Sequence, residues 1–178
     1  MAINFLDYGK VELTNVRLVF RNFRGIGGEY NDEGNRNFNI VIPDQETADI
    51  LMNDCSADGA GWAVRIKPPR NEDDDPFMHL PVKINYRYYD NGEPDIRNPK
   101  VYVEANGRVE EFFEDEIGRL DFINIAEANV IISPSDRIVR GQAYRTAYLD
   151  SIWVRQIVDK YAARYNEYKN VDREDDEY

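Results

Sequence analysis

The chain has 178 residues, which fit one domain with a hydrophobic core, and its formal net charge is -12. Its 42% hydrophobic and 31% charged residues are typical of a globular protein and exclude a low-complexity chain. So acidic a chain is unusual for a nucleic-acid binder, but much of the acid lies in three runs, Glu72–Asp75, Glu110–Glu116 and the last eight residues, so net charge does not exclude that class.

Cysteine content and the N-terminal segment indicate the compartment. Cys55 is the only cysteine, which excludes an intramolecular disulfide and fits a reducing environment. The first ten residues, MAINFLDYGK, lack the pattern of a secretory signal, and no run of 18 apolar residues predicts a membrane span. We therefore expect a cytoplasmic protein.

Short strands begin early in the chain. KVELTNVRLVF alternates apolar and polar residues, with a shift after Asn15 of the kind that a β-bulge produces. GGEYNDEGNR supplies turn residues, and NFNIVI resumes the strand pattern. DQETADILMND predicts a short helix with Asp44 as its N-cap, and GWAVRIK predicts another strand.

The remaining segments extend this pattern to the end of the domain. LPVKINYRYY, PKVYVEA, RVEEFF, INIAEANVIISP and AYRTAYLDSIWV all read as strands, so the sequence predicts a mainly β fold, a small β-barrel with one short inserted helix. The period then changes, because Ile157, Tyr161, Tyr165 and Tyr168 form one helical stripe. We expect a β domain over residues 1–156, a C-terminal helix over 157–170 and a flexible acidic tail over 171–178.

The segment from His79 to Ala105 carries the main functional hypothesis. Alternation predicts two strands around the turn-rich DNGEPDIRNP, with Val82 and Ile84 on a core face and cations, amides and rings on the other. Cations hold phosphates and flat rings stack on exposed bases, as single-stranded nucleic acid requires. With neighbouring strands, the predicted binding face comprises Arg17, Arg21, Arg65, Lys67, Lys83, Asn85, Arg87, Tyr89, Lys100 and Tyr102. The alternative is an ordinary solvated β face.

The last eight residues, VDREDDEY, offer almost no apolar surface for folding. Five carboxylates and a final ring resemble a short single strand of DNA in charge and shape, so this tail could occupy a basic groove or dock on a partner's basic pocket. The alternative is a solubilising tail. The residues concerned are Asp172, Glu174, Asp175, Asp176, Glu177 and Tyr178.

The ordered set VELTNVRLVFRNF, YNDEGNRNFNIVI, GWAVRIKPP, LPVKINYRYYDN, NPKVY, NVIISPSD and AYLDSIWV resembles the bacteriophage single-stranded DNA-binding proteins built on the oligonucleotide/oligosaccharide-binding (OB) fold. The resemblance covers most of the first 155 residues. It implies a replication and recombination protein that coats single-stranded DNA in the cytoplasm of the infected host, with the tail reaching partners such as a polymerase or helicase. An acidic body departs from that pattern.

Catalytic groups are scarce in this sequence. His79 is the only histidine and has no activated nucleophile nearby, so we interpret it as a strand-edge residue. Cys55 lacks a CxxC motif, and RGIGGEY lacks the Lys-Ser/Thr of a phosphate loop, so we expect no enzyme activity, metal or cofactor. Two alternatives stay open: a Mg²⁺-dependent nuclease using the acids of Glu72–Asp75, and a homo-oligomeric structural or virion β-protein.

Overall fold

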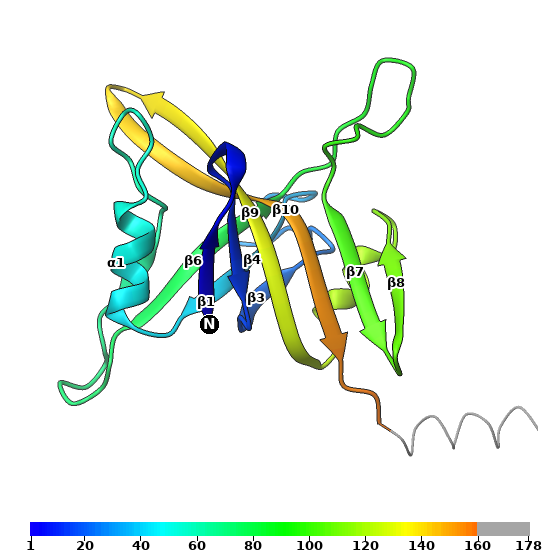
Figure 1. The fold of residues 1–178 in the computed structure, drawn as a ribbon, viewed down its shortest axis with the longest axis horizontal. Helices are drawn as coiled ribbons and strands as arrows, with labels where there is room; N and C mark the ends of the chain where they lie inside the picture. Colours follow the sequence, from blue (N-terminus) through cyan, green and yellow to red (C-terminus); the bar gives the residue numbers. More distant parts are fainter. Residues whose placement is uncertain (160–178) are drawn as a thin grey trace, which may run out of the picture.

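The computed structural model describes residues 1–159, and strands dominate this part of the chain (Figure 1). Its strands are β1 (Ala2–Phe5), β2 (Val11–Thr14), β3 (Leu18–Asn22), β4 (Arg36–Ile42), β5 (Arg65–Lys67), β6 (Phe77–Ile84), β7 (Lys100–Ala105), β8 (Arg108–Phe112), β9 (Ile125–Val139) and β10 (Gln142–Gln156). One α-helix, α1 (Gln45–Asn53), and two 3₁₀ turns, η1 (Asp7–Gly9) and η2 (Ile117–Asp121), complete the described elements. The predicted mainly β fold with a short inserted helix is confirmed.

Two sequence predictions concern the end of the chain. The helix predicted for residues 157–170 lies outside the described residues from position 160 onward, as does the acidic tail over 171–178. The proposed division after residue 156 therefore stays a prediction. Within residues 1–159, no helix is both long and apolar enough to span a membrane.

The strands form a sheet in the order β1-β2-β9-β10-β6-β4-β3. Strands β2 and β3 lie near opposite ends of this order but follow one another directly in the chain. The two ends of the sheet are therefore close together, and the sheet curls on itself (Figure 1). The predicted break after Asn15 is confirmed, because Asn15 has a φ of 52° and separates β2 from β3. Just past the break, the Val16 amide donates to the Ala128 carbonyl of β9 at 2.9 Å.

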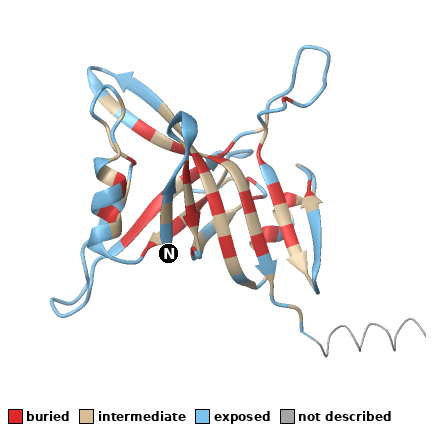
Figure 2. Ribbon diagram, in the orientation of Figure 1, coloured by how far each residue is buried: buried red, intermediate tan, exposed pale blue. Residues whose placement is uncertain are grey.

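Alternation along the strands places one set of side chains inside the curl. Leu13, Ile40, Val82 and Ile132 are fully buried, while the residues between them face outward (Figure 2). Figure 2 shows this as bands of buried and less buried residues along the central strands. The core face that alternation predicted for Val82 and Ile84 of β6 is therefore confirmed.

Helix α1 begins where the sequence predicts. The Asp44 carboxylate accepts a hydrogen bond from the Thr47 amide at 2.8 Å, and hydrogen bonding to the Thr47 side chain, followed by this backbone bond, lowers the pKa of Asp44. Ala48 and Leu51 on the inner face of the helix are fully buried. Beyond the helix, Arg145 of β10 donates to the Asp54 carbonyl at 2.9 Å, which ties the end of α1 to the β9–β10 ribbon.

Two strand predictions are wrong in extent. GWAVRIK forms a strand only over Arg65–Lys67, and LPVKINYRYY leaves the strand after Ile84. Residues 85–99 form a loop in which Asn98 bonds the backbone of Arg87 in both directions, at 2.7 and 2.8 Å. Such side-chain bonds to the backbone compete with strand pairing. As a result β6 and β7 do not form the expected hairpin, and each instead pairs in parallel with β10.

Candidate nucleic-acid interface

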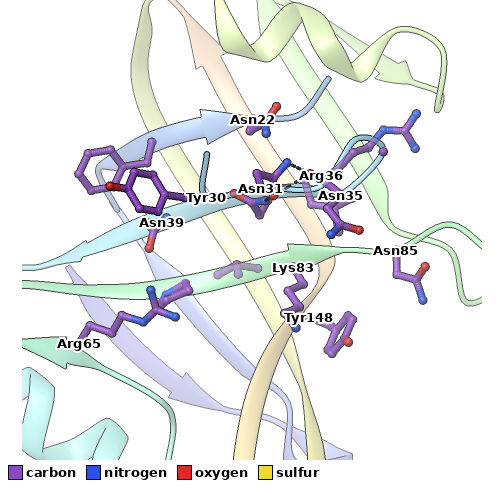
Figure 3. Close-up of a pocket in the computed structure, with 16 residues that line it drawn as sticks. Asn22, Tyr30, Asn31, Asn35, Arg36, Asn39, Arg65, Lys83, Asn85 and Tyr148 are labelled. Atoms are coloured by element: carbon purple, nitrogen blue, oxygen red, sulfur yellow. Dashed lines mark hydrogen bonds between the residues drawn. The ribbon is translucent and has the colours of Figure 1, made fainter. Parts of the chain in front are cut away.

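A groove of about 650 Å³ lies on the outward face of β3, β4 and β6, and we call it the β4–β6 groove (Figure 3). Its lining includes three cations, Arg36, Arg65 and Lys83, and no carboxylate belongs to the described residues that line it. In a chain with a net charge of -12, this is a local concentration of positive charge. Such a hollow attracts anions and raises their local concentration.

Strand register brings the polar groups of the groove together. Asn37 lies opposite Lys83 in the antiparallel β4–β6 pair, and Asn39 lies opposite Pro81. Lys83 is also the partner of Tyr148 in the parallel β6–β10 pair, and Figure 3 shows these two side chains close together. Because successive side chains alternate, the strands that bury Phe38 and Val82 must present these groups to the groove.

The loop between β3 and β4 forms one wall of the groove. The Gly34 amide donates to the Gly25 carbonyl at 2.7 Å, and both glycines have positive φ angles, which only glycine adopts without strain. Asn31 donates to the carbonyls of Ile26 and Asn35, both at 2.9 Å. The braced loop holds Tyr30 with 92% of its surface exposed.

An aromatic cluster lies at one end of the groove. Phe20 is 59% exposed and sits at a φ of 50°, in a bulge between Val19 and Asn22. Its ring meets the Phe77 ring edge to face at a centroid distance of 6.3 Å, and the Lys67 ammonium lies 5.7 Å from its centroid. A bulky residue at positive φ is strained, and such strain concentrates at functional sites.

The His79 ring packs against Phe20 and Phe77 of this cluster. Contrary to the sequence interpretation, it is no strand-edge residue, because it is buried in β6 between β4 and β5. Its ring stacks on Phe77 at a centroid distance of 5.2 Å, and its Nδ1 lies 2.7 Å from the Asn39 Oδ1, which accepts from the protonated nitrogen. Burial, followed by the charges of Lys67 and Arg65, lowers the pKa of His79, which favours the neutral ring.

The groove brings together only part of the binding face that the sequence predicted. Arg65, Lys83 and Asn85 line the groove, and Lys67 flanks it through Phe20. Arg17 and Arg21 line a different hollow beside β9, so they do not extend this surface. There the guanidinium of Arg21 donates to the backbone carbonyls of residues 120 and 123, both at 2.8 Å.

The other predicted residues lie around the loop over 85–99 and β7. Arg87 and Tyr89 belong to the loop, where the Tyr89 hydroxyl donates to Asp95 at 3.4 Å. Lys100 lies 3.8 Å from a Glu111 carboxylate oxygen. Tyr102 lies on β7, opposite Glu111 of β8 and Trp153 of β10. These four residues are not part of the groove lining.

Sequence reasoning missed four groove residues, namely Phe20, Tyr30, Arg36 and Tyr148, and it missed Phe77 of the aromatic cluster beside them. Phe20 follows the apolar alternation of KVELTNVRLVF, and the bulge that turns it outward has no clear sequence signature. Tyr30 did carry a signal, since an aromatic residue inside a Gly- and Asn-rich turn has no strand neighbour to bury it.

A second hollow, of about 530 Å³, lies between the loop over 85–99, β7 and β8, and we call it the β7–β8 hollow. Tyr86, Tyr88 and Phe113 contribute rings, and burial raises the pKa of Tyr86 to about 12. Its lining also includes four carboxylates, from Asp95, Glu111, Glu114 and Asp115. Arg36 lines both hollows, and its guanidinium pairs with Glu114 at 2.8 Å.

Comparison with known proteins, like the charge of the groove, indicates a nucleic-acid-binding protein. Residues 3–177 match the family model described as "Putative phage ssDNA-binding domain". A solved structure of the single-stranded DNA-binding protein from bacteriophage Enc34 in complex with ssDNA aligns with a TM-score of 0.52 and 15% identity, over 88% of this chain and 92% of that one. A second solved structure of the single-stranded DNA-binding protein from bacteriophage Enc34 aligns with a TM-score of 0.52 and 13% identity, over 88% of this chain and 86% of that one. At these identities the likeness shows a shared fold. A search of curated protein sequences finds no match.

Proposed function

The chain belongs to the family of phage ssDNA-binding domains, and we propose that it holds single-stranded DNA in the β4–β6 groove without reading its sequence. The observation that carries this proposal is the combination of three cations, exposed rings and no carboxylate among the described groove residues. Among the comparisons, the Enc34 protein, which shares the fold, is described in complex with ssDNA.

The groove offers two kinds of interaction to a flexible polyanion. Arg65 and Lys83 make no side-chain hydrogen bond or ion pair within residues 1–159, so their charges are free for phosphates. Phe20, Tyr30 and Tyr148 present rings on which bases can stack, at roughly 1 to 3 kcal/mol per base. Every base has a flat face, so this mode of binding tolerates any sequence.

We further propose that the curled sheet is an OB-type barrel. Residues 11–22 pair through β2 with β9 and through β3 with β4, so one bent segment joins the two sides of the sheet. The groove then lies on the strands, and beside the β3–β4 loop, where barrels of this type bind oligonucleotides. Phe20 and Lys83 occupy that position in this chain.

The biological role that we propose is non-enzymatic coating of single-stranded DNA during phage replication and recombination, in the cytoplasm of the infected host. Stacking and charge neutralisation need no cofactor or metal. The acidic segment from Asp172 to Tyr178 would serve two purposes, competing with DNA for the groove and docking on partners such as a polymerase or helicase. Its five carboxylates and its ring supply the two features that the groove selects.

Titration with oligothymidine, followed by intrinsic tyrosine and tryptophan fluorescence at several salt concentrations, tests the proposal. Each neutralised phosphate contributes about -0.7 to the slope of log K against log salt, so Arg65 and Lys83, the two groove cations without an acidic partner among the described residues, predict a slope of about -1.4. Binding should not depend on Mg²⁺, and the oligonucleotide should remain intact. A slope near zero, or no binding, would contradict the proposed function.

A further inference from the structure

Strands β9 and β10 continue beyond their pairing with β6 as a two-stranded arm over residues 135–146, whose base is held to the end of α1 through Arg145 and whose tip projects from the body (Figure 1). Near its tip, Ile138 and Val139 are 59% and 48% exposed. Arg137 and Arg140 are exposed as well, and neither makes an ion pair or hydrogen bond through its side chain within residues 1–159. The arm therefore ends in a knob that is both apolar and basic.

The turn at the tip of the arm favours a role for Arg140. Val139 pairs with Gln142, so Arg140 and Gly141 form a two-residue turn, with φ angles of 50° and 79°. A turn with two positive φ angles favours Asn, Asp or Gly at its first position, because other residues are strained there. Arg140 is therefore strained in this turn, and strain of this kind concentrates at functional sites.

The β7–β8 hollow has the complementary character. Phe113 and Tyr88 are 62% and 55% exposed, and neither ring is covered within residues 1–159. Of the four carboxylates of the hollow, Asp115 has no partner there, whereas Asp95, Glu111 and Glu114 pair with Arg97, Lys100 and Arg36. Rings beside carboxylates bind a guanidinium and its apolar stem, while they repel phosphates and an acidic segment such as 171–178.

We propose that the arm of one copy of this chain docks in the β7–β8 hollow of a second copy. The arm and the hollow lie on opposite sides of the molecule (Figure 1), so an arm meets the hollow of a neighbour rather than its own. A contact between two different surfaces repeats from copy to copy and generates an open row. The contact itself concerns protein self-association, whereas its role between copies on a shared strand rests on the proposed DNA function.

The size of the contact predicts a weak association. A hairpin tip seated in a hollow of about 530 Å³ buries far less than the roughly 1,200 to 2,000 Å² of a stable interface. The free protein should therefore associate only at high concentration. When copies lie on a shared strand, their effective concentration rises, and the same contact becomes strong enough to matter.

Sedimentation velocity of the full chain without DNA, over a wide concentration range at low and high salt, tests the contact. We expect a sedimentation coefficient that rises with concentration and falls when salt is added. Replacing both arginines of the arm (R137E with R140E) should abolish the rise, and so should reversing two acids of the hollow (E111K with D115K). The second pair leaves the Arg36–Glu114 ion pair intact and removes the Lys100–Glu111 pair. The matched control reverses two exposed acids elsewhere (E72K with D73K) and should associate like the wild type.

Mixing the two charge-reversed proteins gives the decisive test. Neither variant should associate with itself, because its arm and its hollow now carry charge of the same sign. In the mixture the reversed arm of one variant should bind the reversed hollow of the other, and the two unchanged surfaces should bind as well, so association should return. A single species at all concentrations, or no recovery on mixing, would overturn the proposal. The arm variant should also bind a short oligonucleotide, which holds one copy, within about twofold of the wild type. A larger loss would assign the arm to DNA and overturn the proposal as well.

Discussion

The β4–β6 groove and the β7–β8 hollow are neighbours that share Arg36, and both contain exposed rings and cations. They differ in what the cations contact. In the groove, Lys83 and Arg65 have no acidic partner among the described residues, whereas Lys100 of the hollow lies 3.8 Å from Glu111. The comparison teaches that the availability of a cation, and not its presence in a strand, distinguishes a surface for polyanions.

The largest expected difference between the two surfaces is the loss of DNA affinity when an exposed ring is removed. Phe20→Ala removes the ring at the end of the groove and should lower affinity for oligothymidine by roughly 1 to 3 kcal/mol, or about 5- to 150-fold. Phe113→Ala is the matched control, because Phe113 is similarly exposed, at 62% against 59%, but lies in the hollow. Fluorescence or filter-binding isotherms should show no change for the control, and equal losses for both variants would remove the distinction between the two surfaces.

The cations give the next effect. Lys83→Ala should reduce the salt slope of binding by about 0.7, since one phosphate contact is lost, and should weaken binding to every sequence alike. Lys100→Ala should leave the slope unchanged, because Glu111 already offsets that charge. The measurement is a salt series of binding isotherms for both variants. A lower slope for the Lys100 variant would mean that the ion pair opens for DNA.

The acidic segment supplies a smaller and condition-dependent effect. Deleting residues 171–178 should raise affinity for DNA if the segment competes for the groove, and the rise should be greatest at low salt, where screening is weakest. Replacing the five acids of the segment by their amides is the matched control for chain length. Unchanged isotherms for both variants would restrict the segment to partner binding or solubility.

The smallest predicted effect concerns stability and pH. Burial lowers the pKa of His79 in the folded protein, so the unfolded chain binds the proton more tightly. The stabilisation from the neutral ring is complete above the ordinary histidine pKa and is lost as pH falls through the lowered value. Denaturant unfolding between about pH 8 and about pH 5 should show a loss that a His79→Gln variant lacks. Identical pH profiles would show that His79 is not held neutral.

Local patterns predicted much of this fold. Alternation identified the buried face of β6, and Asp44 with Thr47 identified the start of α1. Both depend on interactions between near neighbours in sequence, which a single chain reveals. Lys83 and Arg65 were placed on the outward face for the same reason.

Non-local pairing was not predictable from the sequence. The alternation of LPVKINYRYY continues past Ile84, but the bonds between Asn98 and Arg87 turn residues 85–99 into a loop. Phe20 follows the parity of the core residues before it, yet the bulge turns its ring into the groove. Whether a cation meets a carboxylate, as Lys100 does and Lys83 does not, depends on strand partners that alternation leaves open.

Photo-crosslinking of an oligonucleotide containing 5-iododeoxyuridine, followed by peptide mapping, tests most directly which surface holds the strand. The account predicts adducts on the rings of the β4–β6 groove and its aromatic cluster, namely Phe20, Tyr30, Phe77 and Tyr148. Adducts confined to Tyr88, Tyr89 or Phe113 would place the DNA on the acidic hollow and loop instead, and would contradict the claim that unpaired cations beside exposed rings define the binding surface.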